Sequence, residues 1–332
     1  MQYTYLGQSN VKVSRIMLGT MHFGPRCTEH DAFLIMDRAL DMGINFFDTA
    51  NVYGGAETRG WTEEIIGRWL AQGGGRRERI VLASKVYGNM DFSGWPNTER
   101  GLSAYKIRQH AIDSLRRLQT DHLDLYQVHH FDRHIQMGEF WGALGGLVDR
   151  GDVLYLGTSN HPGWGLVKLQ MAARERGLLG LVSEQTQYNL LNRMPELEVL
   201  PAAQDMGIGL LAYMPLAGGL LTGKRLAQAN TRSADVEQEY GVPLTGEQFG
   251  QFAELCGDLG EEPHVVAIAW TLAHPAVTSA LVGIRKIEHL EGLDRATELQ
   301  IPAEAMQRLD KIFNINHGRP LMANVAPEAF AW

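Results

Sequence analysis

Short runs of apolar and β-branched residues alternate along the chain with longer stretches in which apolar residues recur at spacings of three and four. The longer spacing is typical of an amphipathic helix, and a short continuous apolar run is typical of a buried strand. This alternation predicts a parallel sheet whose strands are connected by helices. The predicted strands are 15–20, 44–49, 79–85, 123–129, 153–159, 181–186, 208–214 and 278–283, and the clearest helical patterns lie at 29–43, 62–72, 103–118 and 162–177.

Eight strand-helix units predict a (β/α)8 barrel, or TIM barrel, a fold of about 250 residues. The chain has 332 residues, and we assign the excess to three places. The segments YTYL and VKVS around GQSN predict an N-terminal β-hairpin that caps the barrel floor, residues 223–246 predict a long polar loop, and the end of the chain predicts an extra helix and an irregular tail. No low-complexity linker divides the sequence, so we expect one barrel domain over 1–332. A doubly wound fold is the alternative, but no GxGxxG follows the first predicted strand.

The composition, with 45% hydrophobic and 20% charged residues, is typical of a globular protein. The net charge of -8 argues against a nucleic-acid or anionic-membrane surface and favours small-molecule partners. The two cysteines, Cys27 and Cys256, form no CxxC pair, which suits a reducing compartment. The N-terminus lacks a signal-peptide pattern, and no apolar run approaches about 18 residues. We therefore expect a cytoplasmic protein, and the sequence leaves its oligomeric state, including a homo-oligomer, open.

Four polar residues stand where predicted strands end. Asp48 ends the second strand and Tyr53 lies in the following loop, while Lys85 ends the third strand and His129 the fourth. Each has an ordinary interpretation alone: a turn cap, a residue packed under a loop, a surface lysine and a satisfied core histidine. Because the active site of a (β/α)8 barrel forms at the carboxyl ends of its strands, their joint occurrence favours convergence on one rim.

These residue types together suit the reduction of a carbonyl group. A tyrosine holds its proton at neutral pH and can deliver it to an oxygen that becomes an alkoxide. Lys85 beside the phenol favours phenolate, and Asp48 fixes the lysine and keeps it charged, so we expect a lowered pKa for Tyr53. His129 can orient the carbonyl or share the proton. His130 should face the other way if the strand continues, and the run HHFDRH has no spacing typical of a metal site.

A series of segments carries a family pattern: YLGQSNVKVSRIMLGTMHFG, GINFFDTANVYG, LDLYQVHHFD, GTSN, EQTQYNLLNR, YMPLAGGLLTGK and AWTLAHPAVTSALVG. Taken in order, they resemble the aldo-keto reductase superfamily over essentially the whole chain. The family consists of (β/α)8 barrels that reduce carbonyl groups with NAD(P)H. Its catalytic tetrad falls on Asp48, Tyr53, Lys85 and His129, so the resemblance implies that hydride passes from C4 of the nicotinamide to an aldehyde or ketone while Tyr53 protonates the oxygen.

The resemblance also implies which residues bind the nicotinamide. Ser159 and Asn160 of GTSN, with Gln185 of EQTQYN, resemble the group that hydrogen-bonds its carboxamide and so selects the reactive ring face. Tyr213 takes the place of the aromatic residue that stacks on the ring. Met214 stands where this pattern usually has serine, which removes one polar contact. The following Pro215, Leu216 and Gly218 lead into the loop expected to fold over the coenzyme.

The segment GGLLTGKR, residues 218–225, nearly matches the phosphate-binding pattern GxxxxGK[ST]. Arg225 replaces the hydroxyl residue that would bind magnesium, which argues against nucleotide hydrolysis. Glycine backbone and Lys224 can nevertheless hold a pyrophosphate. The resemblance assigns that pyrophosphate to the dinucleotide.

Near the C-terminus, Gly283 and Arg285 match the family's adenosine-phosphate region, and His289 stands at a further cofactor-binding position of that region. An arginine suits a 2′-phosphate, so we expect NADPH rather than NADH as the cofactor. The chain departs from the pattern at His289, where glutamine or arginine is common. It departs again at Gly292 and Leu293, where the family commonly has a Glu-Asn pair.

The substrate is less clearly indicated than the chemistry. The segments GRWLAQGGGRRER, GLSAYKIR and LRRLQTDHLDLYQVHH resemble bacterial members that include nucleotide-deoxysugar keto reductases, which favours a keto sugar. Pocket-lining loops vary independently of the tetrad; residues expected near the rim are Tyr87, Asn89, Met90, Trp95, Met322 and Trp332.

Two other functions compete with the reductase. A cofactor-sensing regulatory subunit, similar to the potassium-channel β subunits that share this fold, is one alternative. Those relatives depart from the family at the histidine, whereas His129 is present here. A phosphate-binding barrel isomerase is disfavoured because GTSN, EQTQYN and the tetrad occur together.

Overall fold

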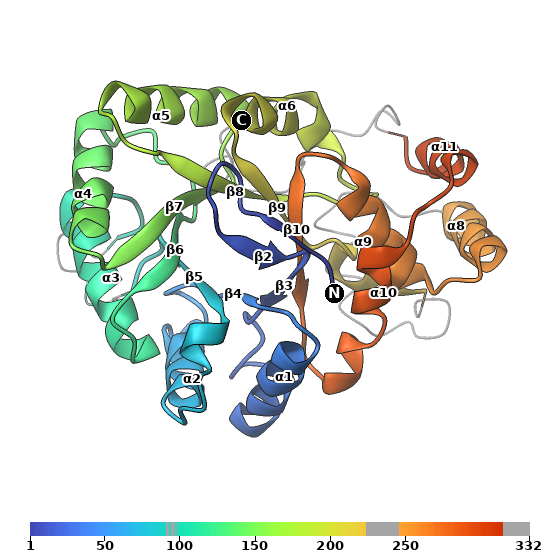
Figure 1. The fold of residues 1–332 in the computed structure, drawn as a ribbon, viewed down its shortest axis with the longest axis horizontal. Helices are drawn as coiled ribbons and strands as arrows, with labels where there is room; N and C mark the ends of the chain where they lie inside the picture. Colours follow the sequence, from blue (N-terminus) through green and yellow to red (C-terminus); the bar gives the residue numbers. More distant parts are fainter. Residues whose placement is uncertain (91–92, 94–96, 98, 224–245, 315–332) are drawn as a thin grey trace.

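The computed structural model describes all residues except 91–92, 94–96, 98, 224–245 and 315–332. Eight parallel strands close into a barrel in the order β10-β3-β4-β5-β6-β7-β8-β9, with the helices arranged around it (Figure 1). This confirms the predicted (β/α)8 fold. The barrel strands are β3 (Ile16–Gly19), β4 (Phe46–Asp48), β5 (Val81–Val86), β6 (Leu123–Val128), β7 (Val153–Ser159), β8 (Leu181–Gln187), β9 (Gly209–Tyr213) and β10 (Val277–Gly283).

The helices between the strands bury one apolar face against the barrel, and two of them, α1 and α3, start at a side-chain cap. Thr28 accepts a hydrogen bond from Asp31 N at the start of α1, and Ser103 accepts one from Lys106 N at the start of α3. No helix among the described residues is long and apolar enough to cross a membrane. The helices are α1 (Glu29–Asp41), α2 (Trp61–Leu70), α3 (Ala104–Leu118), α4 (Met137–Asp149), α5 (Gly163–Glu175), α6 (Val199–Met206), α8 (Gly246–Leu259), α9 (Pro263–Ala273), α10 (Leu293–Glu298) and α11 (Ala303–Ile312).

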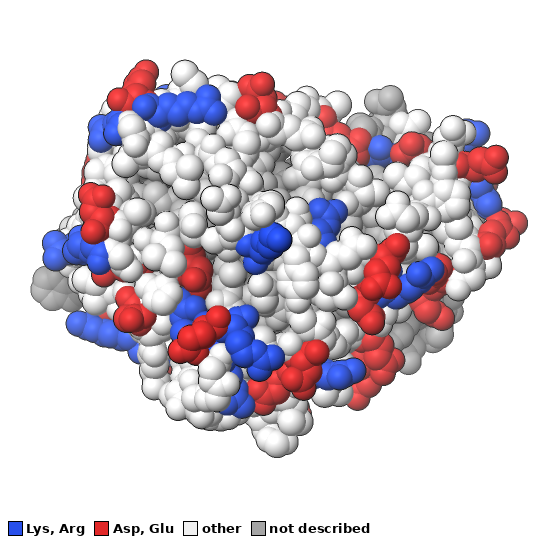
Figure 2. All heavy atoms as spheres, in the orientation of Figure 1, with Lys and Arg blue, Asp and Glu red and all other residues white. Residues whose placement is uncertain are grey.

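The predicted C-terminal helix is α11, and the tail expected after it lies mostly outside the described residues. Most of the long loop predicted at 223–246 also lies outside them, and α8 begins at Gly246. On the face shown in Figure 2, positive and negative side chains lie next to one another.

The predicted hairpin consists of β1 (Tyr3–Tyr5) and β2 (Lys12–Ser14), which pair in antiparallel fashion. Leu6 and Val13 are fully buried against apolar side chains inside the barrel. The close approach depends on Gly7, which has a φ of +52°, because a Cβ atom there would lie 2.2 Å from Val182 O. The hairpin therefore closes the barrel floor, as the sequence predicts.

Alternate residues of each strand point to opposite sides of the barrel wall. In β4, Phe46 belongs to the interior cluster and Phe47 to the outer layer under the helices; in β6, Leu125 and Tyr126 divide in the same way. On β4, β5, β6 and β8, an inward position close to the carboxyl end is polar. These polar inward residues include Asp48, Lys85, Gln127 and Gln185.

Candidate active site

The Lys85 ammonium lies at the centre of the polar group. Its Nζ donates to Asp48 Oδ2 at 2.5 Å, to Thr49 O at 3.0 Å and to Tyr53 OH at 3.3 Å. The side chains of Lys85 and Asp48 are 0% and 2% exposed. Since β4 and β5 pair directly in the barrel, two adjacent strands and the loop after one of them bring the three side chains together.

Tyr53 is held by the turn that leads into α2. Its carbonyl accepts hydrogen bonds from Gly60 N at 2.9 Å and Thr62 N at 3.4 Å. Gly54 is required by the close return of the chain: its φ is +127°, and a Cβ atom there would lie 2.3 Å from Thr58 O. Asn51 N donates to Lys85 O at 3.3 Å, so the turn is also tied to β5.

The pKa of Tyr53 is raised, which corrects the expectation of a lowered value. Burial raises this pKa, the Lys85 ammonium lowers it, and the Asp48 carboxylate raises it again. Burial alone lowers the pKa of Lys85, but the neighbouring Asp48 and Tyr53 raise it overall. At neutral pH the site therefore holds a protonated phenol next to a charged ammonium.

His129 follows the last residue of β6 directly, and its backbone N–H donates to Val86 O at 2.9 Å. Its ring meets Tyr53 edge to face, with centroids 5.9 Å apart. Burial, the Lys85 charge and His130 lower the pKa of His129 well below its usual value. His129 is thus a neutral imidazole beside the phenol.

The expectation that one of the two histidines faces away from the site is wrong. The rings of His129 and His130 stack, with centroids 4.9 Å apart and planes 16° apart. The alternation of a strand does not apply to them, because β6 ends at Val128. The ring of His130 also meets Tyr87, with centroids 5.1 Å apart, so that predicted rim residue lies next to the tetrad.

Three of the residues predicted to bind the nicotinamide contact one another or the tetrad. Asn160 Nδ2 donates to His129 O and to Ser159 Oγ, each at 3.0 Å. Tyr213 OH donates to Asn160 Oδ1 at 2.9 Å. These contacts join the ends of β7 and β9 to the end of β6.

Gln185, predicted to bind the nicotinamide carboxamide, also contacts the tetrad inside the barrel. Its Nε2 donates to Asp48 Oδ1 at 3.0 Å. Gln127 Nε2 donates to the same oxygen at 3.0 Å, so both carboxylate oxygens of Asp48 are satisfied. Sequence reasoning missed Gln127, although a glutamine near the end of the mostly apolar strand LDLYQV, two positions before His129, is a usable signal.

The turn after β9 contains the predicted residues Met214, Pro215, Leu216 and Gly218. Met214 has a φ of 54°, Ala217 of 49° and Gly218 of 66°. Met214 O accepts hydrogen bonds from Asn189 Nδ2 and Ala217 N, each at 2.8 Å. These two hydrogen bonds hold the turn in place. Lys224, which follows the turn, lies outside the described residues.

The residues assigned to the adenosine end lie at the end of β10 and directly after it. Gly283 ends this strand and is exposed, Arg285 is exposed, and His289 is half-buried in a 3-10 turn at Ile287–Leu290. The rim residues Asn89 and Met90 are half-buried. Three further rim residues from the sequence prediction lie outside the described residues, namely Trp95, Met322 and Trp332.

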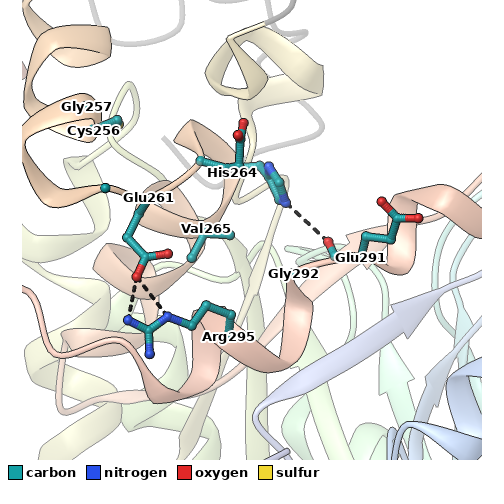
Figure 3. Close-up of a pocket in the computed structure, with 10 residues that line it drawn as sticks. Cys256, Gly257, Glu261, His264, Val265, Glu291, Gly292 and Arg295 are labelled. Carbon is teal, nitrogen blue, oxygen red and sulfur yellow. Dashed lines mark hydrogen bonds and ion pairs between the residues drawn. The ribbon is translucent and has the colours of Figure 1, made fainter.

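A separate pocket of about 520 Å³ is lined by the end of α8, the start of α9 and the segment before α10 (Figure 3). Within it, Arg295 Nε donates to Glu261 Oε1 at 2.8 Å, and His264 Nε2 lies 3.2 Å from Glu291 O. The described residues predicted for catalysis and coenzyme binding do not line it. Gly292, where the chain departs from the family pattern, does.

The donor set at the tetrad suits a nicotinamide carboxamide, which both donates and accepts hydrogen bonds. Ser159 offers its hydroxyl hydrogen, and Asn160 and Gln185 each offer acceptor capacity on the amide oxygen, because their nitrogens already donate within the site. Tyr53, His129, Asn160 and Tyr213 are partly exposed, so the site opens to the rim.

A family model and several known proteins match the sequence over most of its length. A family model described as "Aldo/keto reductase family" matches residues 15–314. The uncharacterized oxidoreductase YrpG of Bacillus subtilis is 49% identical over the whole of both chains. A putative aryl-alcohol dehydrogenase of Schizosaccharomyces pombe is 31% identical, with 93% of this chain and 95% of that protein covered. A probable voltage-gated potassium channel subunit beta of Oryza sativa is 30% identical, with 96% and 98% covered.

Proposed function

The chain belongs to the aldo/keto reductase family, and we propose that this NAD(P)H-dependent oxidoreductase reduces an aldehyde or ketone at the site formed by Asp48, Tyr53, Lys85 and His129. The observation that carries the proposal is the contact of one buried ammonium, Lys85 Nζ, with both Asp48 Oδ2 and Tyr53 OH. This arrangement holds a proton donor at the open end of the barrel, as the protonation of a carbonyl oxygen requires.

Each residue has a distinct task in the proposed reaction. When bound, the reduced nicotinamide supplies the hydride from C4. Tyr53 keeps its proton because burial raises its pKa, and it gives this proton to the substrate oxygen as negative charge develops there. Lys85 stabilises the phenolate that remains, and Asp48 fixes Lys85. His129 is neutral, so it can donate one hydrogen bond that orients the carbonyl.

The experiment that tests this assignment is Tyr53→Phe. Carbonyl reduction should fall by at least about 100-fold, because the general acid is lost. Binding of the reduced coenzyme, followed by fluorescence titration, should stay close to wild type. Tyr105→Phe is a matched control, since Tyr105 is 66% exposed on α3. Near-normal turnover by the Tyr53 variant would show that the proton comes from elsewhere.

The finer proposal for the coenzyme is NADPH. Arg285 is exposed after β10, where its guanidinium can bind a 2′-phosphate through paired hydrogen bonds. Measuring kcat/KM with NADPH and with NADH tests the preference. Arg285→Ala should lower the ratio of the two values by about tenfold or more, whereas Arg108→Ala, an exposed arginine on α3, should leave it unchanged. A wild-type preference for NADH would overturn the assignment.

For the substrate, we propose a keto sugar. The support is the resemblance of several segments to bacterial keto-sugar reductases and the polar rim, where Tyr87 and His130 lie in contact. A relative named as a putative aryl-alcohol dehydrogenase makes aromatic aldehydes the natural comparison set. A panel of both classes, followed by the loss of absorbance of the reduced nicotinamide, should give the higher kcat/KM for keto sugars. A clear preference for aromatic aldehydes would replace the proposal.

The second candidate function is a coenzyme-sensing regulatory subunit, favoured by the relative named as a probable potassium channel subunit beta. His129 beside Tyr53 supports the enzyme instead. Steady-state turnover separates the two. A regulatory subunit should bind the reduced coenzyme and release its oxidised form only over many minutes, whereas enzyme turnover is typically on the order of 1 per second or faster.

A further inference from the structure

A fully buried carboxyl group lies behind the site, and the proposed reaction does not use it. Glu184 precedes Gln185 on β8, and because Gln185 points into the barrel toward Asp48, Glu184 points outward through the wall. Its side chain is 0% exposed. Oε1 accepts a hydrogen bond from His161 N at 3.0 Å. Oε2 and the Thr158 hydroxyl are both buried, and neither forms a regular hydrogen bond within the described part of the chain, although Thr158 acts on the carboxyl group.

The group that Glu184 holds is the turn Ser159–Asn160–His161 at the end of β7. Asn160 has a φ of 58°, which is unusual for a residue other than glycine. Its backbone N–H donates to Gln185 O at 3.0 Å. His161 Nδ1 lies 2.8 Å from Ser159 O and must donate, because a carbonyl oxygen only accepts. Glu184 therefore joins β8 to a tight turn that carries two of the predicted nicotinamide contacts.

The surroundings of Glu184 contain little that would stabilise a charge. Its partners on the neighbouring strands, Thr158 on β7 and Leu210 on β9, are uncharged. The titratable side chain beside it is His161, whose pKa burial lowers to about 4, and Glu184 forms no ion pair within the described part of the chain. Burial raises the pKa of Glu184 to about 8, although Thr158 and the N–H groups of His161 and Asn160 oppose this.

We propose that Glu184 is a positioning residue of the coenzyme site: its neutral carboxyl group holds the turn Ser159–His161 against β8, and loss of its proton to solvent loosens the turn and weakens coenzyme binding. A buried carboxylate with one unpaired oxygen is unstable unless water enters or the strand end moves. Movement there displaces Ser159 and Asn160. The inference rests on the proposed function, because it takes these two residues to contact the nicotinamide.

The test compares wild type with Glu184→Gln, which keeps the shape of the side chain and cannot ionise. Dissociation constants for NADPH and NADH are measured by fluorescence titration from about pH 6.5 to about pH 9.5. Wild type should bind about tenfold more weakly at pH 9 than at pH 7, since the competent form declines as Glu184 ionises. The variant should match wild type within about twofold at pH 7 and stay flat above it.

Glu63→Gln serves as the matched control, because Glu63 is another glutamate with 0% exposure but is paired with Arg117 on the outside of the barrel. This control should follow the wild-type pH profile. A measurement that needs no variant is the infrared difference spectrum of wild type, in which the carbonyl band of a protonated carboxyl group should disappear with a midpoint near pH 8.

Two outcomes contradict the inference while leaving the reductase proposal intact. One is that coenzyme binding by Glu184→Gln weakens with rising pH in parallel with binding by wild type. The other is a variant that binds coenzyme much more weakly than wild type at pH 7, which would mean that the carboxylate form is needed. If neither coenzyme binds wild type at any pH, the proposed function itself fails and the inference falls with it.

Discussion

Asp48→Asn should destabilise the protein by about 3 kcal/mol, although it changes a single atom. Asp48 is 1% exposed and accepts three hydrogen bonds, one from Lys85 and one each from Gln127 and Gln185. An asparagine has one acceptor oxygen in place of two, and it leaves the buried ammonium without a counter-charge. Removing one partner of a buried ion pair costs about 3–5 kcal/mol. We expect the lower end, because Lys85 keeps Thr49 O as an acceptor.

The assay is urea-induced unfolding followed by tryptophan fluorescence, with Lys85→Met and the double variant measured in parallel. Lys85→Met alone leaves the buried Asp48 carboxylate without a counter-charge, whereas the double variant removes both charges. The double variant should therefore be more stable than the sum of the single costs implies, by at least about 1.5 kcal/mol. Asp113→Asn is the control, because its partner Arg116 is 74% exposed and such a pair contributes less than about 1 kcal/mol. Strict additivity, or a cost below about 1 kcal/mol for Asp48→Asn, would refute the reasoning.

Four further predictions concern stability. Gly67→Ala in α2 should cost more than about 2 kcal/mol in the free energy of unfolding, because the new Cβ would lie 2.1 Å from Arg117 O. Gly142→Ala in α4, where a Cβ meets nothing within 4 Å, should instead stabilise by about 0.5–1 kcal/mol in the same urea assay. Glu63→Gln should cost about 2 kcal/mol, because Glu63 Oε2 accepts a hydrogen bond from Arg117 Nε at 2.7 Å in a buried pair. A loss of stability smaller than the gain from Gly142→Ala would contradict this prediction. Thermal unfolding from about pH 4.5 to about pH 8 should show wild type losing up to about 5 kcal/mol of stability relative to Glu184→Gln. The reason is that the pKa of Glu184 is about 8 in the folded protein and 4.5 in the unfolded chain. The stabilisation is therefore complete below pH 4.5 and is lost as the pH rises to about 8.

The barrel could be predicted because its cause is local. Each strand reads as a short apolar run, and each helix repeats its apolar residues at spacings of three and four. The tetrad follows from the same pattern, since Asp48, Lys85 and His129 stand at the ends of those runs. The hairpin under the barrel is also local, as two short apolar segments flank the turn GQSN.

The electrostatics could not be predicted in the same way. The pKa of Tyr53 depends on how completely the phenol is buried, and burial of a loop residue is a tertiary property. The stacking of His130 on His129 depends on β6 ending at Val128, one residue earlier than the apolar run suggests. Glu184 escaped notice because a glutamate in a strand is ordinary in sequence and unusual only when it is enclosed on all sides.

The strands that carry the site also carry the apolar interior of the barrel above the hairpin, and this helps to explain why the buried ion pair is tolerated. On β4 the inward residue below Asp48 is Phe46, and on β5 the one below Lys85 is Ala83. Both belong to the apolar cluster that Leu6 of the hairpin seals from below. Water therefore cannot reach the pair from the floor, and the Coulomb attraction between the two charges acts in a medium of lower dielectric constant than water. The side facing the rim stays open, so Tyr53 can give its proton to a substrate that binds there.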